Sequence, residues 1–373
     1  MRLAWRAAGA GTAGRRFLIL SARMGSGHDA VASALAARLE AAGHETIRAD
    51  VLELLPAGVG TGIRSGYRVV IERAPLLYAG IYQSFFRGGD GAIRPGSAPL
   101  AALGERRVLD LVRRERADVV VPVFHLAAQI TGRLRARGAL SVPSAVVMTE
   151  FEAHRQWLHP GNDLYLCHAD EIAAGIRRGA GCAAAAYGPV VDPRFTAPED
   201  GARADSWRQR LASAGRPVVL LSTGAWGIGS SLAPTAALVH EAGYVPAILC
   251  GQNERLRRHF AEITPAAALG WVDDMPALMH AASVLIDNAA GQTATEALAA
   301  GLPVVGYRPI PGHGADGVRL MARLGLSDHA RDPGELLAAL SRLTGPGPAR
   351  DRRIAAGRAV FRPGAIRTLA NLA

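Results

Sequence analysis

Short apolar runs alternate with segments of helical spacing along the chain. Runs of about four to eight apolar residues between turn residues are typical of buried strands, whereas apolar residues three and four positions apart are typical of helices. In the first half we predict strands at residues 16–21, 46–51, 117–122, 144–149 and 163–167. The alternation starts again in the second half, with strands predicted at 217–222, 245–250, 267–271, 283–287 and 302–307.

Helices are expected between these strands, for example at 29–42, 231–242, 275–282 and 293–300. Such alternation indicates parallel sheets in an α/β fold. The polar, Gly- and Pro-containing stretch 188–216 interrupts it and predicts a linker with a short helix. We therefore expect two doubly wound, Rossmann-like domains facing a central cleft, where the carboxyl ends of the strands bind ligands. The expected parts are a disordered tail (1–14), a first domain (15–195), a linker (196–216), a second domain (217–348) and a C-terminal helix packing back on the first domain (349–373).

The amino-acid composition excludes some classes of function and favours others. All 42 basic Lys+Arg residues are arginine, which excludes a Schiff-base lysine and a P-loop lysine. The net charge of +10 suits an anionic partner such as a phosphate-bearing substrate, an acidic membrane surface or nucleic acid, although arginine spread over a surface explains it equally well. The three cysteines show no CxxC spacing, which indicates a reducing compartment without a disulfide framework or zinc site. The N-terminus lacks the apolar core of a signal peptide, and no apolar run approaches the roughly 20 residues that span a bilayer.

A glycine turn, Gly25-Ser26-Gly27-His28, separates the first predicted strand from its helix. Glycine permits a sharp turn and the close approach of a ligand, and amides at a helix start attract anions. A histidine there could take a proton from a substrate hydroxyl. The alternative is a tight turn with a capping histidine.

Two further segments favour a nucleotide donor. The turn at 223–229 follows a strand of the second domain and could cradle a diphosphate, although it lacks the G-x-G-x-x-G spacing. In the segment 283–309, a small-residue turn opens a helix at Gln292-Thr293, whose amides and hydroxyl could hold a phosphate. Glu296, one turn later, could bind a ribose diol with both carboxylate oxygens, or could simply interact with the helix dipole.

The segment 283–309 resembles the donor-binding segment of the GT-B glycosyltransferases that include monogalactosyldiacylglycerol synthases, processive diacylglycerol glucosyltransferases and the lipid II-forming N-acetylglucosaminyltransferase. The resemblance is closest to the glycolipid-synthase branch and covers most of the chain. Residues 17–28 resemble its first strand and catalytic turn, and 149–165 its T-D-F-x-x-H-x-x-W-x-x-P-x-x-D-x-Y segment. Residues 188–195 are similar to G-x-P-V-x-P-x-F, and 270–279 to G-F-V-D-x-M-x-x-L-M.

The resemblance implies a UDP-sugar donor, inverting transfer and no metal or other cofactor, since amides, helix dipoles and arginine can neutralise the leaving group. It implies catalytic roles for His28, as base or acceptor-orienting group, and for Glu150. The implied donor-binding residues are Gly224, Trp226, Gly227, Trp271, Val272, Met275, Gly291, Gln292, Thr293, Glu296 and His313. The implied acceptor-binding residues are Gly25, Ser26, Gly27, Tyr78, Tyr82, His125 and His154.

The sequence departs from the family pattern at positions that the resemblance places near the donor sugar. The family usually has Asp at the position of Glu150, and often P-G-Q-E where this chain has Pro311-Gly312-His313-Gly314. His313 and Asp316 are the residues placed to replace the lost Gln-Glu pair, so donor specificity is expected to differ.

Residues 75–86, PLLYAGIYQSFF, concentrate aromatic and aliphatic side chains between Arg73 and Arg87. This composition suits a membrane surface or a lipid-chain site, with a buried core helix as the alternative. We therefore predict an enzyme that moves a hexose from a UDP-sugar to a hydroxyl of a lipid or lipid-linked acceptor of the diacylglycerol type. It would be cytoplasmic and peripheral on the anionic inner face of the cell membrane, with no nucleic-acid partner. The alternatives are a natural-product tailoring transferase with an isoprenoid-phospholipid or other acceptor, an epimerase acting on UDP-GlcNAc, and a non-catalytic nucleotide-sugar binding protein.

Overall fold

The computed structural model describes residues 14–86, 97–198, 200–211, 214–222, 232–262 and 268–372. The first domain contains two three-stranded parallel sheets, with strand orders β2-β1-β3 and β4-β5-β6. A parallel bridge between Val120 and Ser144 connects β3 to the start of the second sheet. The strands are β1 (Arg16–Ser21), β2 (Glu45–Asp50), β3 (Val119–Pro122), β4 (Ala145–Val147), β5 (Leu164–Cys167) and β6 (Ala184–Ala186).

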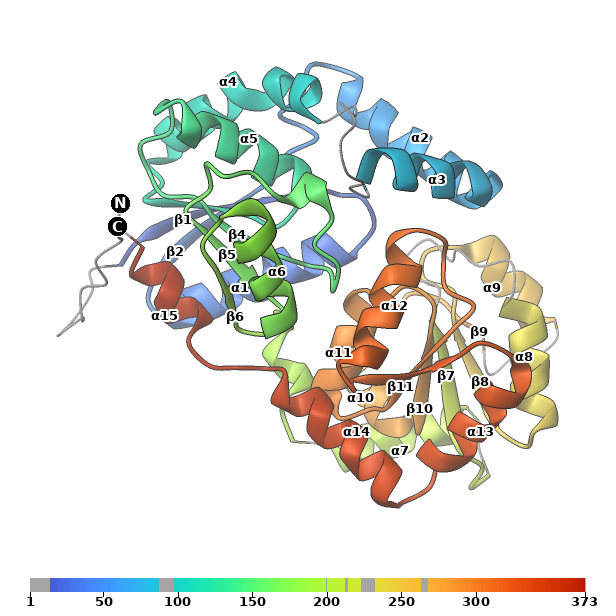
Figure 1. Ribbon diagram of the computed structural model, residues 1–373. Coiled ribbons are helices and arrows are strands. Elements are labelled where there is room, and N and C mark those ends of the chain that lie inside the picture. Colours follow the sequence, from blue (N-terminus) through green and yellow to red (C-terminus); the bar gives the residue numbers. More distant parts are fainter. Residues whose placement is uncertain are drawn as a thin grey trace.

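Helices cover both faces of these sheets (Figure 1). The α-helices are α1 (Gly27–Ala41), α2 (Val59–Arg73), α3 (Pro75–Ile81), α4 (Ala98–Glu115), α5 (His125–Ala136) and α6 (Asp170–Ala180). A π-helical turn, η1 (Tyr82–Phe86), continues α3, and short 3₁₀ turns form η2 (Arg155–Trp157) and η3 (Pro193–Phe195). None of the described helices has the length and apolar character needed to cross a membrane.

The second domain has a six-stranded sheet in the order β12-β11-β10-β7-β8-β9, and neighbouring strands in it run parallel. Its strands are β7 (Val218–Ser222), β8 (Val245–Leu249), β9 (Ala268–Leu269), β10 (Val284–Asp287), β11 (Val304–Tyr307) and β12 (Ser327–Ala330). The accompanying helices are α7 (Gly201–Arg210), α8 (Leu232–Glu241), α9 (Glu254–Ala261), α10 (Met275–Ala281), α11 (Gln292–Ala300), α12 (His313–Arg323), α13 (Pro333–Leu343) and α14 (Pro348–Ala359).

The C-terminal segment crosses back to the first domain (Figure 1). After α14, helix α15 (Ala365–Ala370) brings Leu369 and Leu372 into the core cluster that contains Phe17. The Tyr187 hydroxyl lies 2.6 Å from Thr368 Oγ1 and strengthens this contact. The two domains are therefore joined at two places, by the segment around η3 and by the chain between α14 and α15.

The predicted strands are all present, although 267–271 is reduced to the two residues of β9. Two strands were not predicted. β6 is an alanine triplet without β-branched residues, and it forms because the edge of β5 supplies hydrogen-bonding partners. β12 (SDHA) is a polar edge strand paired only with β11 among the described strands. Helix α8 is described from Leu232, one residue inside its predicted start.

Candidate active site

A cavity of about 390 Å³ lies between the two domains, where the carboxyl ends of their strands face each other. The first domain contributes the glycine turn after β1, the segment after β3 and the segment after β4. The second domain contributes Ser222 and Asp287, at the ends of β7 and β10, and the residues that follow β10 and β11. Gly27 and Gln292 are close across this boundary: a Cβ built at Gly27 would lie 3.5 Å from Gln292 Cβ.

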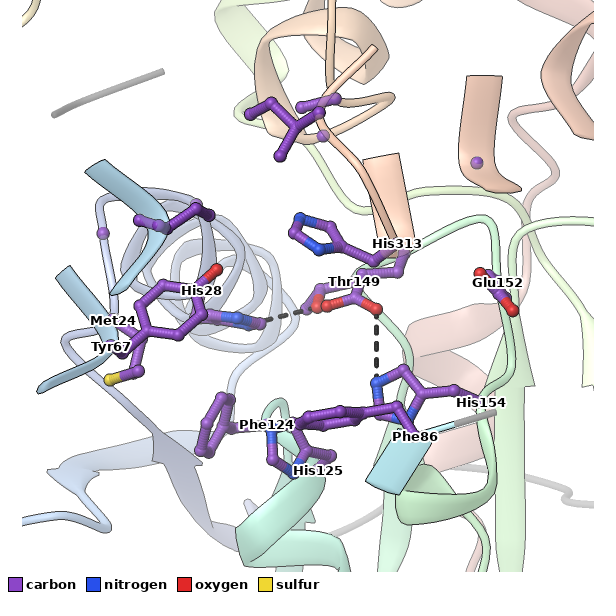
Figure 2. A pocket seen from close by; sticks show the side chains of 18 of the residues that line it. Met24, His28, Tyr67, Phe86, Phe124, His125, Thr149, Glu152, His154 and His313 are labelled. Atoms are coloured by element: carbon purple, nitrogen blue, oxygen red, sulfur yellow. Dashed lines mark hydrogen bonds and ion pairs between the residues drawn. The ribbon is translucent and has the colours of Figure 1, made fainter. Parts of the chain in front are cut away.

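His28 occupies the start of α1, and its imidazole is held by the first domain (Figure 2). Its Nδ1 lies 3.0 Å from the carbonyl oxygen of Val123 and 3.1 Å from Thr149 Oγ1. The Val123 carbonyl can only accept a hydrogen bond, so Nδ1 carries the proton and Nε2 is left as a proton acceptor. Burial lowers the pKa of His28 to about 4, which keeps the ring neutral. The alternative of a capping histidine is wrong, since the side chain bonds to Val123 and Thr149 instead of the helix end.

Glu150 follows β4 and is three-quarters buried, with a side-chain exposure of 24%. Its Oε2 lies 3.5 Å from both Trp157 Nε1 and His154 Nε2, which are long contacts for a charged group. Burial raises the pKa of Glu150 to about 7. Its carboxylate is thus poorly compensated and can change charge near neutral pH.

Two further histidines, His125 and His154, form one wall of the cavity (Figure 2). Their ring centroids are 5.4 Å apart, and the Nδ1 atom of each is buried without a hydrogen-bond partner in the described structure. Burial lowers the pKa of His125 to about 3 and holds that of His154 well below its usual range. These imidazoles are neutral polar groups, suited to bind a hydroxyl.

Tyr78 and Tyr82 lie where the first domain meets the start of α12. The Tyr78 hydroxyl lies 2.7 Å from His313 Nδ1, and the Tyr82 hydroxyl donates to Glu152 Oε2 over 2.6 Å. Burial raises the pKa of Glu152 to about 7, and the nearby Asp316 contributes to this rise. Like Glu150, Glu152 is therefore a carboxyl in the cavity whose ionised form is disfavoured by burial.

The start of α11 gives the cavity an end that is suited to bind an anion. Asp287 accepts hydrogen bonds from the backbone amides of Ala289 (2.9 Å) and Ala290 (2.6 Å), which shapes the turn before the helix. The N-cap residue, Gly291, has no side chain to cap the helix, so the first amides are available to a ligand. Gly291, Gln292 and Thr293 all line the cavity.

The comparisons with known proteins agree on the class. The family model of monogalactosyldiacylglycerol (MGDG) synthase matches residues 28–184. A processive diacylglycerol β-glucosyltransferase of Bacillus pumilus is 24% identical over 314 residues, which is 80% of this chain and 78% of that protein. MurG of Acinetobacter baumannii superposes with a TM-score of 0.58 at 17% identity, over 96% of this chain and 99% of that chain. A UGT transferase from Siraitia grosvenorii in complex with UDP gives a TM-score of 0.61 at 14% identity, over 95% and 98%.

This chain is a GT-B glycosyltransferase. It is similar to the monogalactosyldiacylglycerol synthases over residues 28–184 and to the processive diacylglycerol glucosyltransferases over most of its length, and its two-domain α/β fold was predicted from the sequence.

The structure brings most of the predicted residues of the glycosyltransferase to one place. The following line the cavity: Gly25, Ser26, Gly27, His28, Tyr78, Tyr82, His125, Glu150, His154, Gly291, Gln292, Thr293 and His313. Gly224, Trp226 and Gly227 lie outside the described residues, as does Arg87.

Other predicted donor residues lie outside the cavity of the glycosyltransferase. Trp271 is 53% exposed, with its Nε1 donating to Asp273 Oδ1 over 3.0 Å. Val272 and Met275 pack partly buried against the second-domain core. Glu296 lies one turn after Gln292, to which it is hydrogen bonded, and burial raises its pKa to about 7.

Sequence reasoning missed Glu152 and Asp287 as polar residues of the cavity. Glu152 had a usable signal, because it stands between Glu150 and His154 in a segment that already carried the motif. Asp287 had another, because a carboxylate at the end of a buried strand often organises the following turn. No group of three or more His, Cys, Asp or Glu side chains in the described part of the chain is arranged to hold a metal ion.

Proposed function

We propose that this glycosyltransferase moves a hexose from a UDP-sugar to a hydroxyl of an uncharged lipid acceptor at a membrane surface, with inversion and without a metal ion. The observation that carries the proposal is that a neutral histidine, His28, and the uncapped start of α11 line the same cavity from opposite domains. The B. pumilus relative is named for transfer of glucose to diacylglycerol, and the S. grosvenorii structure contains UDP; both support the choice of substrates.

On the donor side, the diphosphate would bind at the first turn of α11. The amides there and the helix dipole favour negative charge, which grows on the diphosphate as the glycosidic bond breaks. Thr293 would add a hydroxyl, and Glu296, one turn along α11, would bind the ribose.

On the acceptor side, the hydroxyl would give its proton to His28 Nε2 while its oxygen attacks the anomeric carbon. The bond between that carbon and the diphosphate oxygen breaks on the opposite face, so the configuration inverts and UDP leaves with the bonding electrons. Val123 and Thr149 keep the imidazole in the tautomer that this step requires.

The lining of the cavity favours an apolar, uncharged acceptor. Its first-domain part is rich in aliphatic and aromatic side chains, including Leu52, Ile71, Phe86, Leu100 and Phe124. The carboxyls Glu150 and Glu152 would repel an anionic head group. We therefore favour a diacylglycerol-type acceptor over an isoprenoid phospholipid.

Exposed apolar side chains beside the cavity support membrane docking. Leu77 and Ile81 of α3 are 57% and 40% exposed, and Val69 of α2 is 50% exposed. Both helices lie at one end of the first domain (Figure 1). The exposed Arg68 and Arg73 of α2 are suited to anionic lipid, which is why we place the enzyme on the inner face of the cell membrane.

Ligand-induced stabilisation tests the donor. UDP at about 100 times its Kd should add about 2.7 kcal/mol of stability, and UDP should stabilise the protein more than GDP or TDP does. A preference for TDP or GDP would contradict the donor assignment.

Transfer is tested with UDP-glucose and UDP-galactose on diacylglycerol in phosphatidylglycerol vesicles. We expect lipid-linked sugar with wild type, and little product with His28→Ala. Leu77→Asp with Ile81→Asp should reduce vesicle binding without changing stabilisation by UDP. Free sugar or an epimerised donor released without acceptor would contradict the transferase proposal and favour the epimerase alternative.

A further inference from the structure

A buried glutamine, Gln156, connects two walls of the cavity that come from different parts of the first domain. Its side-chain Nε2 donates to the carbonyl oxygen of Phe85 over 2.9 Å. Its Oε1 accepts hydrogen bonds from the backbone amide (3.2 Å) and the hydroxyl (2.7 Å) of Ser97. Phe85 belongs to η1 and Ser97 precedes α4, and both line the cavity. Gln156 itself is only 3% exposed, so one buried side chain holds both walls.

Backbone groups fix the orientation of the Gln156 amide. The Phe85 carbonyl can only accept a hydrogen bond and the Ser97 backbone amide can only donate one, so Nε2 faces η1 and Oε1 faces α4. The Ser97 hydroxyl must then donate to Oε1, because that oxygen carries no proton. The two walls therefore bind opposite ends of one amide, and a reversed amide would lose both hydrogen bonds to the backbone.

Neighbouring side chains support this connection. Ser97 is the N-cap residue of α4, a position where a serine side chain usually caps the helix, but its hydroxyl makes no capping hydrogen bond and bonds to Gln156 instead. Gln129 of α5 donates to the backbone carbonyl of Gln156 over 2.9 Å, which holds the backbone of η2 in place. Arg155 Nε donates to the same Phe85 carbonyl over 2.9 Å. The polar groups around Gln156 thus serve the link between η1 and α4.

The two walls enclose an apolar part of the cavity close to the reacting groups. On one side, Phe86 follows the bonded carbonyl, and its ring centroid lies 4.9 Å from that of His154 (Figure 2). On the other side, Leu100 of α4 lines the cavity one turn after Ser97. His28 lines the same cavity. Under the proposed function, an acceptor whose hydroxyl reaches His28 would place its apolar part against these walls.

We propose that Gln156 is a positioning residue for the lipid acceptor, which keeps the η1 wall and the α4 wall at the spacing into which the apolar part of the acceptor fits. This inference rests on the proposed function, and adds to it a residue that acts through Phe85 and Ser97 and touches neither substrate. Because the walls contact the apolar part of the acceptor, the role of Gln156 should appear in acceptor binding and not in the chemical step.

The variant Gln156→Met tests this role, because methionine has a similar length and no amide. We expect the KM for dioctanoylglycerol in detergent micelles to rise about four- to tenfold, the loss expected when one or two methylene groups of the acceptor leave apolar contact. The kcat and the affinity for UDP should stay within about twofold of wild type. An unchanged KM would overturn the proposal.

Asn162→Leu is the matched control for Gln156→Met. Asn162 is 4% exposed, and its amide is hydrogen bonded to groups that do not line the cavity, in Ala128, Thr131, Ser144 and Tyr165. Both variants should lower the melting temperature, because each leaves buried polar groups without partners. Only Gln156→Met should raise the KM, and an equal rise in Asn162→Leu would reduce the role of Gln156 to general stability.

The variant Ser97→Ala provides a second test, which does not depend on the folding of Gln156→Met. It removes only the 2.7 Å hydrogen bond to Oε1 and should raise the KM about two- to fivefold. Added to Gln156→Met, it should change the KM by less than about 1.5-fold, since both substitutions break the same connection. An undiminished effect in the double variant would show that Ser97 acts on the acceptor without Gln156, and would overturn the proposal.

Direct binding separates this inference from the proposed function. Without any donor sugar, we expect calorimetry to give a Kd for dioctanoylglycerol that is about four- to tenfold higher in Gln156→Met than in wild type. If this difference is found but the wild type transfers no sugar to the lipid, the proposed function is refuted and the role of Gln156 stands. If the wild type transfers sugar but the two Kd values are equal, only the role of Gln156 is refuted.

Discussion

Replacing Glu150 with glutamine should stabilise the protein and slow the enzyme at the same time. Burial raises the pKa of this carboxyl from 4.5 to about 7, which corresponds to roughly 3 kcal/mol at about 1.36 kcal/mol per pKa unit. The folded state binds the proton more tightly than the unfolded state does, so stability falls as pH rises from about 4.5 to 7 and is level above that. Glutamine carries no charge at any pH and avoids this loss.

The variant should gain less stability than this full ionisation penalty. The side chain is 24% exposed, and the new amide needs hydrogen-bond partners of its own. We therefore expect Glu150→Gln to gain about 1–2 kcal/mol at pH 8, with little gain at pH 5.

The assay is thermal denaturation at pH 5 and pH 8, combined with steady-state kinetics at pH 8. Glu53→Gln is the control, since it removes the same charge from an exposed site, 63% accessible. We expect the melting temperature of Glu150→Gln to rise by a few degrees at pH 8 only, and its kcat to fall because a negative charge is lost from the cavity that His28 also lines. An equal gain at both pH values, or a loss of stability at pH 8, would refute the reasoning.

Other substitutions test the remaining roles. His28→Ala should lower kcat by about 10²–10⁴ without weakening UDP binding, as measured by kinetics and calorimetry. Glu296→Ala should weaken UDP binding about 10- to 100-fold by calorimetry, the range for a charged hydrogen bond to ribose. Gly188→Ala should lower the melting temperature, because φ is +81° and the new Cβ would overlap the carbonyl oxygen of Val360; Gly179→Ala, in open space on α6, is its control. Chelation with EDTA should leave the transfer rate unchanged, and a loss restored by Mg²⁺ would contradict the metal-free mechanism.

Most of the strands that sequence could predict stay apolar on both faces, whereas β2 (ETIRAD) was predicted although it is largely polar. The interior of β1 is an uninterrupted apolar run and is fully buried, as parallel sheets between helix layers require. β6 and β12 lack this signal, because one is alanine and the other polar. They become strands only after a neighbouring edge exists, and that is a tertiary effect.

The chemistry at strand ends could be predicted because local turns create it, as at Gly25–His28 and Gly291–Thr293. The pairing of Tyr78 with His313 could not, because 235 residues separate them and no periodicity connects the two domains. The exposure of Trp271 could not be predicted either, since an aromatic residue next to a buried helix is usually expected to pack in the protein core.

In the proposed mechanism, the two domains stabilise charges of opposite sign. In this mechanism a positive charge would develop on His28, and a negative charge would develop on the diphosphate leaving group. In the first domain, Glu150 and Glu152 line the same cavity as the histidine, and carboxylates there would favour an imidazolium. The second domain holds the start of α11, whose amides stabilise an anion. The groups that would stabilise these charges lower the stability of the folded protein before the reaction begins. For this reason we expect that replacing Glu150 would raise stability and lower turnover.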